Sequence, residues 1–346
     1  MMLNQLLGTS ISIIQAPMAG VQDATLAAAV CEAGGLGSLP CAMLSLESLE
    51  VEVTKLTELT EQPYNLNFFC HSPSEPSVQQ QNKWKATLAT FFKELDIEPP
   101  HSSAGPARKP FDEGTLHILE RFRPAVVSFH FGLPRPEWVE QIKSWGSKIF
   151  STATTLEEAS WLAQNGADAI IAQGLEAGGH RGSFLTDDMT TQSGTLSLVP
   201  QICAQVPLPV IAAGGIAGPD GVRAAVALGA AGVQVGTTFL LCPEANTGPL
   251  HRAALISDTA THTALTNVFT GRPARSIVNR LVREIGPMTS AAPPFPSAAS
   301  MVTALRQATE PSGKSDFTPL WCGQNASGCR NIPASEILQL LARGFT

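Results

Sequence analysis

A glycine-rich segment that carries one imidazole is the strongest chemical feature of the sequence. Residues 173–182 read QGLEAGGHRG and follow a short apolar run, 169–172, that is typical of a buried strand. A backbone this rich in glycine can wrap closely around a ligand. His180 would titrate near neutral pH, which suits a general base or a hydrogen-bond donor to an anionic substrate. A lone histidine is more often an ordinary polar side chain, but its place in a glycine loop after a strand makes His180 the candidate catalytic residue.

Two further glycine segments have the composition of a phosphate site. Residues 212–216 read AAGGI and residues 234–238 read QVGTT, and each follows a predicted strand. Either alone could be only a tight turn. Their placement after consecutive strands favours a phosphate site, because backbone N–H groups at such positions bind anions. The hydroxyl of Thr237 would be an extra donor.

A second histidine, His130, lies in the motif SFHFG at the end of another predicted strand. Alternation places it on the same face as Ser128, so it can point inward to a substrate pocket, although a histidine between aromatic residues is often structural. We expect the remaining histidines to be solvated or structural: His71, His101, His117, His251 and His262. No two histidines have the spacing H-x-x-x-H, so no metal site is predicted.

The elements that must position these residues are short β-branched runs alternating with helical patterns, which is typical of a parallel sheet built from βαβ units. The predicted strands number eight, as in a (β/α)8 TIM barrel, whose active site lies at the carboxyl ends of the strands. They are Ile11–Gln15, Leu36–Leu39, Leu66–Phe69, Val126–Phe131, Ile149–Thr152, Ala169–Gln173, Val210–Ala213 and Val233–Val235.

The helices and insertions follow from similar patterns. Thr155 followed by Glu158 predicts a reciprocal capping box at a helix start. Two Pro- and Ser-rich stretches, 72–113 and 286–319, interrupt the alternation and are interpreted as insertions, the first with a helical segment inside. We therefore expect a barrel over 1–240, a smaller and mainly helical domain over 241–320, and a segment over 321–346 that returns to the barrel.

Length and composition limit the alternatives. A chain of 346 residues that is 44% hydrophobic can bury one barrel with a smaller domain, and equally two domains. The net charge of −7 argues against nucleic acid or anionic lipid as partner. Seven scattered cysteines without a C-x-x-C pair indicate neither a disulfide framework nor a zinc site. Without a secretion signal or an apolar run of about 18 residues, we expect a cytoplasmic protein that is not embedded in a membrane. The sequence leaves an oligomer open.

The motifs QAPMAG, NFF, SFHFGLP, AQGLEAGGHRG, PVIAAGGIA and GVQVGTTFL, with the later TGRPARSIVNRL and PLWCGQ, resemble class I nitronate monooxygenase over nearly the whole chain. The resemblance implies an FMN enzyme of TIM-barrel fold with a smaller helical domain over the flavin. It also implies oxidation of alkyl nitronates, such as propionate 3-nitronate, with O₂ to carbonyl compounds and nitrite or nitrate, a detoxifying reaction.

Matched position by position, the resemblance also predicts roles for single residues. His180 would bind the anionic nitro group when protonated, or take the α-proton of a neutral nitroalkane. The expected flavin contacts are Met18, Asn67, Gln173, Gly178, Gly179, Gly215, Gln234, Val235, Gly236 and Thr237.

Three alternatives stay open on the sequence alone. The nearest is a flavin-dependent enoyl-acyl-carrier-protein reductase, which shares the EAGGH and GGI elements but uses NAD(P)H; no G-x-G-x-x-G follows a strand here, which argues mildly against a bound nicotinamide. The second is a non-catalytic sensor of a phosphate ligand on the same barrel. The third is an isomerase of a sugar phosphate.

Overall fold

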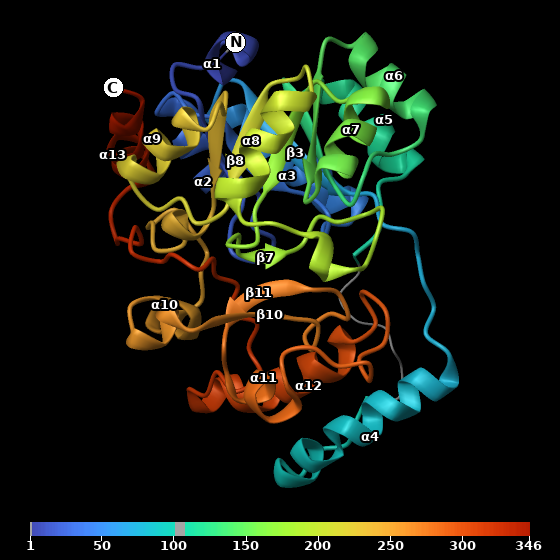
Figure 1. Ribbon diagram of the computed structural model, residues 1–346. Helices are drawn as coiled ribbons and strands as arrows, with labels where there is room; N and C mark the ends of the chain where they lie inside the picture. Colours follow the sequence, from blue (N-terminus) through green and yellow to red (C-terminus); the bar gives the residue numbers. More distant parts are fainter. Residues whose placement is uncertain (1, 101–107) are drawn as a thin grey trace.

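The computed structural model, which describes residues 2–100 and 108–346, contains a barrel of parallel strands with helices around it (Figure 1). Neighbouring strands follow the order β1-β9-β8-β6-β5-β4-β3-β2, and a parallel bridge between Ile14 and Leu36 brings the first and last strands together. The barrel strands are β1 (Ile13–Gln15), β2 (Gly37–Pro40), β3 (Tyr64–Phe69), β4 (Val126–His130), β5 (Lys148–Ala153), β6 (Ala169–Gln173), β8 (Val210–Ala213) and β9 (Gly232–Val235). The fold is therefore a (β/α)8 TIM barrel, as predicted.

All eight predicted strands lie in this sheet, and only their ends differ. The third strand begins at Tyr64 rather than Leu66, because Tyr64 and Asn65 pair with Gly37 and Ser38 of β2. Because Asn65 is polar, the apolar run in the sequence begins only at Leu66. It is buried here, and its amide donates to the Ser38 hydroxyl at 2.9 Å.

Helices connect the strands, and six of the thirteen described α-helices begin at a side chain that accepts from a backbone amide of the first turn. The α-helices are α1 (Leu3–Leu7), α2 (Ala24–Glu32), α3 (Leu46–Leu59), α4 (Val78–Glu94), α5 (Glu113–Phe122), α6 (Pro136–Ser144), α7 (Leu156–Gln164), α8 (Thr195–Gln205), α9 (Pro219–Ala227), α10 (Pro249–Leu255), α11 (Arg280–Ile285), α12 (Ala299–Thr309) and α13 (Ala334–Ala342). Short 3-10 helices are η1 (Met189–Thr191), η2 (Thr237–Phe239), η3 (Asp258–Thr261), η4 (Glu310–Ser312) and η5 (Arg343–Phe345).

The start of α7 differs from the predicted capping box. The Thr155 hydroxyl accepts from the Glu158 amide at 3.2 Å, as expected. The Glu158 carboxylate, however, accepts from the amide and hydroxyl of Thr154 and from the amide of Phe184. This fully buried carboxylate thus ties the helix start to the segment that follows His180, a contact that sequence spacing could not indicate.

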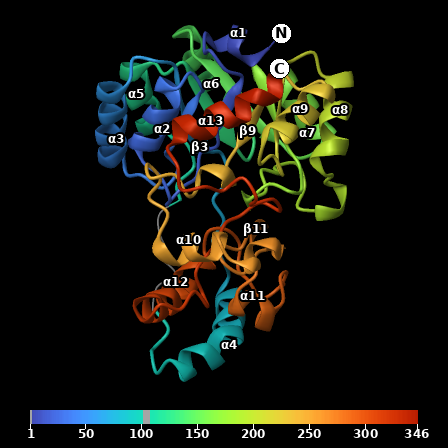
Figure 2. The same ribbon diagram turned by 90° about the vertical axis from the view of Figure 1, so that its left-hand side faces the viewer.

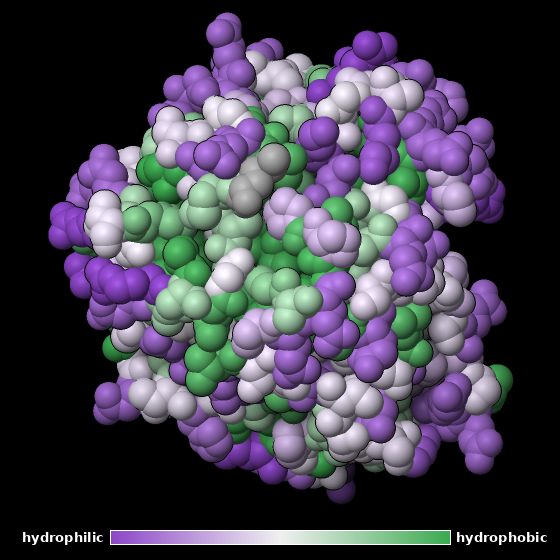
Figure 3. Space-filling model, turned by 45° about the horizontal axis from the view of Figure 1, so that its top comes forward, coloured by the Kyte–Doolittle hydropathy of each residue, from purple (hydrophilic) through white to green (hydrophobic). Residues whose placement is uncertain are grey.

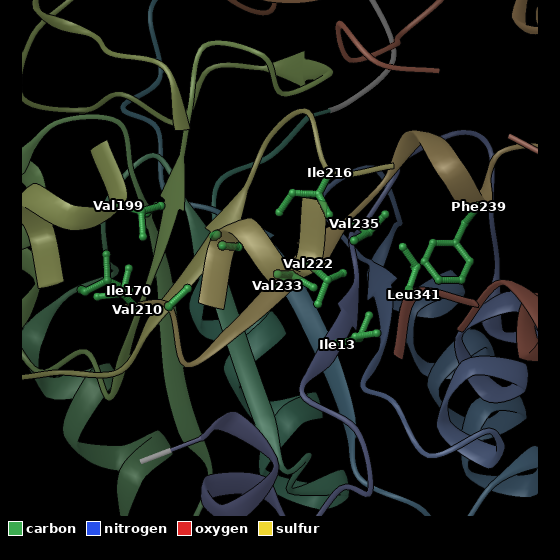
Figure 4. Close-up of a cluster of buried hydrophobic side chains, with 14 of the residues drawn as sticks. Ile13, Ile170, Val199, Val210, Ile216, Val222, Val233, Val235, Phe239 and Leu341 are labelled. Atoms are coloured by element: carbon green, nitrogen blue, oxygen red, sulfur yellow. The ribbon is translucent and has the colours of Figure 1, made fainter. Parts of the chain in front are cut away.

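The main core lies between the sheet and its covering helices (Figure 4). Ile13, Ile170, Val210 and Val233 come from four different strands, and Val222 of α9 packs against them. Side chains of this size stabilise a fold by about 1.5–3 kcal/mol each when fully buried. The carboxyl ends of the strands are therefore held in fixed positions.

The chain ends on the barrel. Helix α13 packs beside α2 and α9 on the outside of the barrel (Figure 2), with Ile337, Leu338 and Leu341 buried in the main core.

The face that includes the top of Figure 1 has hydrophobic residues near its centre and hydrophilic residues around them (Figure 3). No described helix combines the length and the apolar composition that a membrane span needs.

A second, smaller unit lies below the barrel in Figure 1. Strands β10 (Thr263–Thr266), β11 (Ala274–Ile277) and β7 (Gly179–His180) form an antiparallel sheet. A separate core joins α4, α11 and α12, with Trp84 of α4 donating to the Ala298 carbonyl at 3.2 Å. The helix predicted within 72–113 thus packs on the smaller unit; residues 101–107 of that stretch lie outside the described residues. The division of the chain at residues 240 and 320 stays a prediction.

Candidate active site

One cavity opens at the carboxyl ends of the barrel strands, where the smaller unit meets them. Every site residue predicted from the sequence lines it: Met18, Asn67, His130, Gln173, Gly178, Gly179, His180, Gly215, Gln234, Val235, Gly236 and Thr237. These residues come from loops and strand ends far apart in the chain. The barrel brings them together because its strands all end on the same side.

Glycines form one end of the cavity. Gly214 has φ +129° and Gly215 has φ +71°, backbone conformations that side chains other than glycine rarely adopt. The C-terminal segment covers this end: the Gly323 amide donates to the Thr237 hydroxyl at 2.9 Å, and the Asn325 amide group donates to the Gly215 carbonyl at 3.3 Å. The Thr237 hydroxyl is thus a hydrogen-bond acceptor within the chain.

His180 lies at the other end, on a strand that links the two units. Strand β7 follows the glycine loop of the barrel and pairs with β11, so that His180 lies opposite Ala274. Its Nε2 is 2.9 Å from the hydroxyl of Thr270, which is 1% exposed. The position of the imidazole is therefore set by both units together.

The backbone of His180 is held as firmly as its ring. Its carbonyl accepts from Nε2 of Gln173 at 2.9 Å and from Nε2 of His130 at 3.2 Å. The Gln173 side-chain oxygen accepts from the Gly182 amide at 2.9 Å. Gln173 thus uses its amide group within the loop, and His130 positions His180 as well as lining the cavity.

A buried arginine holds together the loop between β6 and β7. Arg181, which is fully buried, donates to the carbonyls of Gln173 and Gly174 at 2.6 and 2.7 Å and to the side chain of Gln192 at 2.7 Å. Charged donors form the stronger hydrogen bonds in proteins. The loop therefore keeps one shape, although it is rich in glycine.

Aromatic rings surround the imidazole. The ring centroids of Phe295 and Trp321 are each 5.3 Å from that of His180, and those of Phe131 and Phe69 are 6.4 and 6.5 Å away. Phe131 has φ +71°, a conformation that costs energy for a bulky residue and is typical of functional sites. These rings bury much of the imidazole, although His180 is only partly shielded from solvent.

The same burial changes the protonation of the site. It lowers the pKa of His180 well below its usual value, and the charge of Arg108 lowers it further. Burial also lowers the pKa of His130 to about 3. The prediction that His180 titrates near neutral pH is therefore wrong for the free protein, since desolvation disfavours the imidazolium.

Other cavity residues were missed in the sequence. His251 lines the cavity and its Nε2 is 3.1 Å from the Trp321 carbonyl, while Arg108 lies at the His180 end. His71 is buried near that end, with its ring centroid 4.9 Å from that of Phe295. His251 belongs to α10 and Arg108 to the end of the 72–113 stretch, so no pattern at the end of a strand marks either of them. His71 follows β3.

Near pH 7 the only formal charge in the described lining is the positive charge of Arg108. His130, His180 and His251 also belong to the lining, but burial lowers their pKa values and keeps them neutral, and none of the described lining residues is an aspartate or glutamate. Among the described residues, no group of three histidine, cysteine or acidic side chains is placed to hold a metal ion. A cavity of this kind favours an anionic ligand although the whole chain carries −7.

Comparison with known proteins agrees with this geometry. A family model described as nitronate monooxygenase matches residues 1–344. The chain belongs to this family. A nitronate monooxygenase of Pseudomonas aeruginosa is 41% identical over 97% of both chains, and one of Paraburkholderia phytofirmans is 38% identical over 98% of this chain and 93% of its own. The family identifies the chain as an oxidoreductase.

Solved structures extend the comparison to the fold. The chain is similar to a nitroalkane oxidase from Streptomyces ansochromogenes, with a TM-score of 0.89 and 38% identity over 98% of this chain and 96% of that one. It is less similar to FabK from Thermotoga maritima, with a TM-score of 0.72 and 26% identity over 99% of this chain and 95% of that one. The nitronate monooxygenase family and its structural neighbours are flavin enzymes.

Proposed function

We propose that this chain uses FMN and O₂ to oxidise alkyl nitronates to carbonyl compounds and nitrite or nitrate, and that it thereby detoxifies them. The observation that supports this proposal best is the cavity itself. A glycine-lined end suited to a phosphate and an imidazole end enclosed by aromatic rings belong to one continuous space. An isoalloxazine ring between these ends would face His180.

The residues present fit a flavin. The buried side-chain oxygen of Gln234 has no hydrogen-bond partner within the described chain, although it belongs to the cavity lining. A buried polar atom without a partner costs about 1–3 kcal/mol, so a ligand group is its expected partner. Gly215, Gly236 and Thr237 would hold the phosphate, and Asn67, Gln173, Gly178, Gly179 and Val235 would border the rest of the cofactor, with Met18 beside it.

When bound, FMN supplies the electron transfer that no side chain can carry out. The protein supplies binding and electrostatics. His180 is neutral in the free cavity, and an anionic nitronate beside it favours the protonated imidazole, which then donates a hydrogen bond to the nitro oxygens. With a neutral nitroalkane, the neutral imidazole instead accepts the α-proton.

Oxygen consumption by the purified, flavin-loaded protein tests this function. We expect uptake of O₂ and release of nitrite or nitrate when propionate 3-nitronate is added, and no uptake with buffer alone. A flavin-loaded protein that turns over none of several nitronates would contradict the proposal and would favour a non-catalytic sensor.

A flavin-dependent enoyl-acyl-carrier-protein reductase is the second candidate. An enoyl reductase domain of MlnA from Bacillus amyloliquefaciens shares the fold with a TM-score of 0.54, but at 14% identity this likeness concerns the fold alone. NADH added without oxygen separates the two candidates. Rapid loss of the flavin absorbance would support the reductase, whereas the monooxygenase predicts little change.

A further inference from the structure

The contact between Thr270 and His180 decides which nitrogen of the imidazole faces the cavity. Nε2 of His180 is 2.9 Å from the hydroxyl of Thr270, a side chain that is 1% exposed. Nδ1 of His180 has no hydrogen-bond partner among the described residues, and it is not one of the buried atoms left without a partner. His180 lines the cavity, so Nδ1 is the ring nitrogen that a ligand can reach.

A hydroxyl can donate or accept, and a second contact of the Thr270 hydroxyl indicates its direction here. This hydroxyl donates to the Arg272 carbonyl at 3.5 Å, which is long, but a carbonyl oxygen can only accept. The hydroxyl oxygen then accepts from His180, and this bond requires a proton on Nε2. The neutral imidazole therefore has its lone pair on Nδ1, toward the cavity.

The fold of the smaller unit holds this hydroxyl in place. Thr270 lies in the turn between β10 and β11, where the Gly271 amide donates to the Asn267 carbonyl at 2.8 Å. Gly271 has φ +89°, and a Cβ atom at this position would lie 2.1 Å from the Pro293 carbonyl oxygen. Because β11 also pairs with β7, the turn and His180 keep one relative position.

The partner of the imidazole is a neutral group, so it orients the ring without stabilising a charge on it. The other charged or titratable groups that act on the His180 ring are Arg108, His130, Arg272 and His71. None of these groups is a carboxylate. A carboxylate in the place of Thr270 would stabilise the imidazolium, as in a catalytic triad. A hydroxyl instead leaves the ring neutral until an anion binds beside it.

We propose that Thr270 is a positioning residue that keeps a proton on Nε2 of His180, so that Nδ1 is the atom that meets the substrate. The inference rests on the proposed function, because it takes this substrate to be a nitronate. When the anion binds, Nδ1 takes up a proton from solvent and donates to the nitro group, while Nε2 still donates to Thr270. Both N–H groups of the imidazolium then have a partner, which a charge in an apolar site requires.

Two substitutions of Thr270 in the flavin-loaded protein test this role. Thr270→Val removes the hydroxyl and leaves the N–H group at Nε2 without a partner. We expect its kcat/KM for propionate 3-nitronate to fall by about 10- to 100-fold, the scale of one unpaired buried group. Thr270→Ser keeps a hydroxyl and should recover most of this loss. Wild-type kcat/KM in Thr270→Val would overturn the proposal.

Thr266→Val is the matched control, because it makes the same change at a threonine of β10 that is also 1% exposed and lies outside the cavity lining. It should keep the wild-type kcat/KM. If Thr266→Val loses as much activity as Thr270→Val, the effect is one of packing and the proposal is wrong.

The position of the proton is a readout that a merely structural role would not change. In protein labelled with ¹⁵N-histidine, chemical shifts distinguish a protonated ring nitrogen from an unprotonated one, and His180→Gln identifies the signals of His180 by their loss. Near pH 7 we expect the proton on Nε2 in the wild type and in Thr270→Ser, and at least partly on Nδ1 in Thr270→Val. A proton on Nδ1 in the wild type, or an unchanged tautomer in Thr270→Val, would overturn the proposal.

Failure of the proposed function would give a different result. Flavin-loaded wild-type protein that oxidises no nitronate would contradict the function, whichever nitrogen carries the proton. An active wild type with its proton on Nδ1 would contradict only the role of Thr270. The wild-type spectrum does not depend on the folding of any Thr270 variant, so the two failures are distinguishable.

Discussion

At the scale of single residues, the site depends on how little freedom His180 has. Its ring is fixed by Thr270, its carbonyl by Gln173 and His130, and the rings of Phe295 and Trp321 pack beside the imidazole. An imidazole held in this way loses little entropy when a substrate arrives. Removing the ring should therefore lower the turnover rate and leave flavin binding unchanged.

His180→Ala tests this directly. We expect the variant to keep its flavin but to lower turnover by roughly 10²–10⁴, the scale of acid–base contributions. Flavin content per protein and kcat are the measurements. His117→Ala, a change at an exposed histidine of α5, is the control and should have no effect. Wild-type turnover in His180→Ala would remove this residue from the mechanism.

The sequence predicted His180 because a glycine loop after a strand is a local feature. It could not predict His71, Arg108 or His251 as members of the site, because their positions depend on loops and on the smaller unit. It also could not predict the lowered pKa of His180, which comes from rings that are distant in the chain: Phe69, Phe131, Phe295 and Trp321.

At the scale of elements, the loops after β8 and β9 must leave room for a ligand. Gly215→Val should abolish or strongly weaken FMN binding, since a β-branched residue is strained at φ +71° and its methyl groups would occupy the space of the phosphate. The dissociation constant of FMN, from fluorescence titration of the apoprotein, is the measurement. Gly248→Val is the control, because its side chain would meet open space at φ −65°. Equal FMN affinity in the two variants would contradict the phosphate site.

The contact between η2 and the C-terminal segment gives a milder test. Thr237→Val removes the hydroxyl that accepts a hydrogen bond from the Gly323 amide. In the proposed complex the same hydroxyl would donate a hydrogen bond to the phosphate. We expect FMN affinity to fall by about 1–3 kcal/mol, or roughly 5- to 150-fold, the cost of leaving such a group without its partner. Unchanged affinity by the same titration would show that Thr237 does not contact the cofactor.

The barrel strands were predicted with small errors at their ends because each contains a short buried run rich in apolar residues, and polar residues such as Asn65 obscure where some of them begin. Strand β7 could not be predicted in the same way, because it has only 2 residues and exists through its pairing with β11. That pairing places His180 against the smaller unit. A prediction from local pattern finds the loop but not the strand inside it.

At the scale of the whole molecule, buried histidines couple stability to pH. Burial lowers the pKa of His71 to about 4, of His130 to about 3 and of His251 to about 4, from 6.5. Between these values and about 6.5 the unfolded chain binds protons that the folded chain does not. The contribution of these histidines to the free energy of unfolding is therefore fully present above pH 6.5. Below that pH the free energy of unfolding falls by about 1.4 kcal/mol per pH unit for each histidine.

Thermal unfolding between pH 7.5 and 5 tests this dependence. We expect Tm to fall below pH 6.5, and to fall less steeply in His251→Gln, which has one buried imidazole fewer. The comparison uses slopes, so a constant loss of stability in the variant does not affect it. Equal slopes in both proteins would show that His251 does not contribute.

The barrel and the smaller unit complete the cavity together, and we propose that it holds FMN with the flavin ring turned toward a nitronate at His180. The most direct measurement is the absorption spectrum of the purified protein before and after propionate 3-nitronate is added without oxygen. We expect a yellow protein whose flavin band bleaches on addition of the nitronate and returns when air is admitted. A correctly folded, colourless protein that binds no added FMN, or a flavin band that the nitronate leaves unchanged, would contradict it.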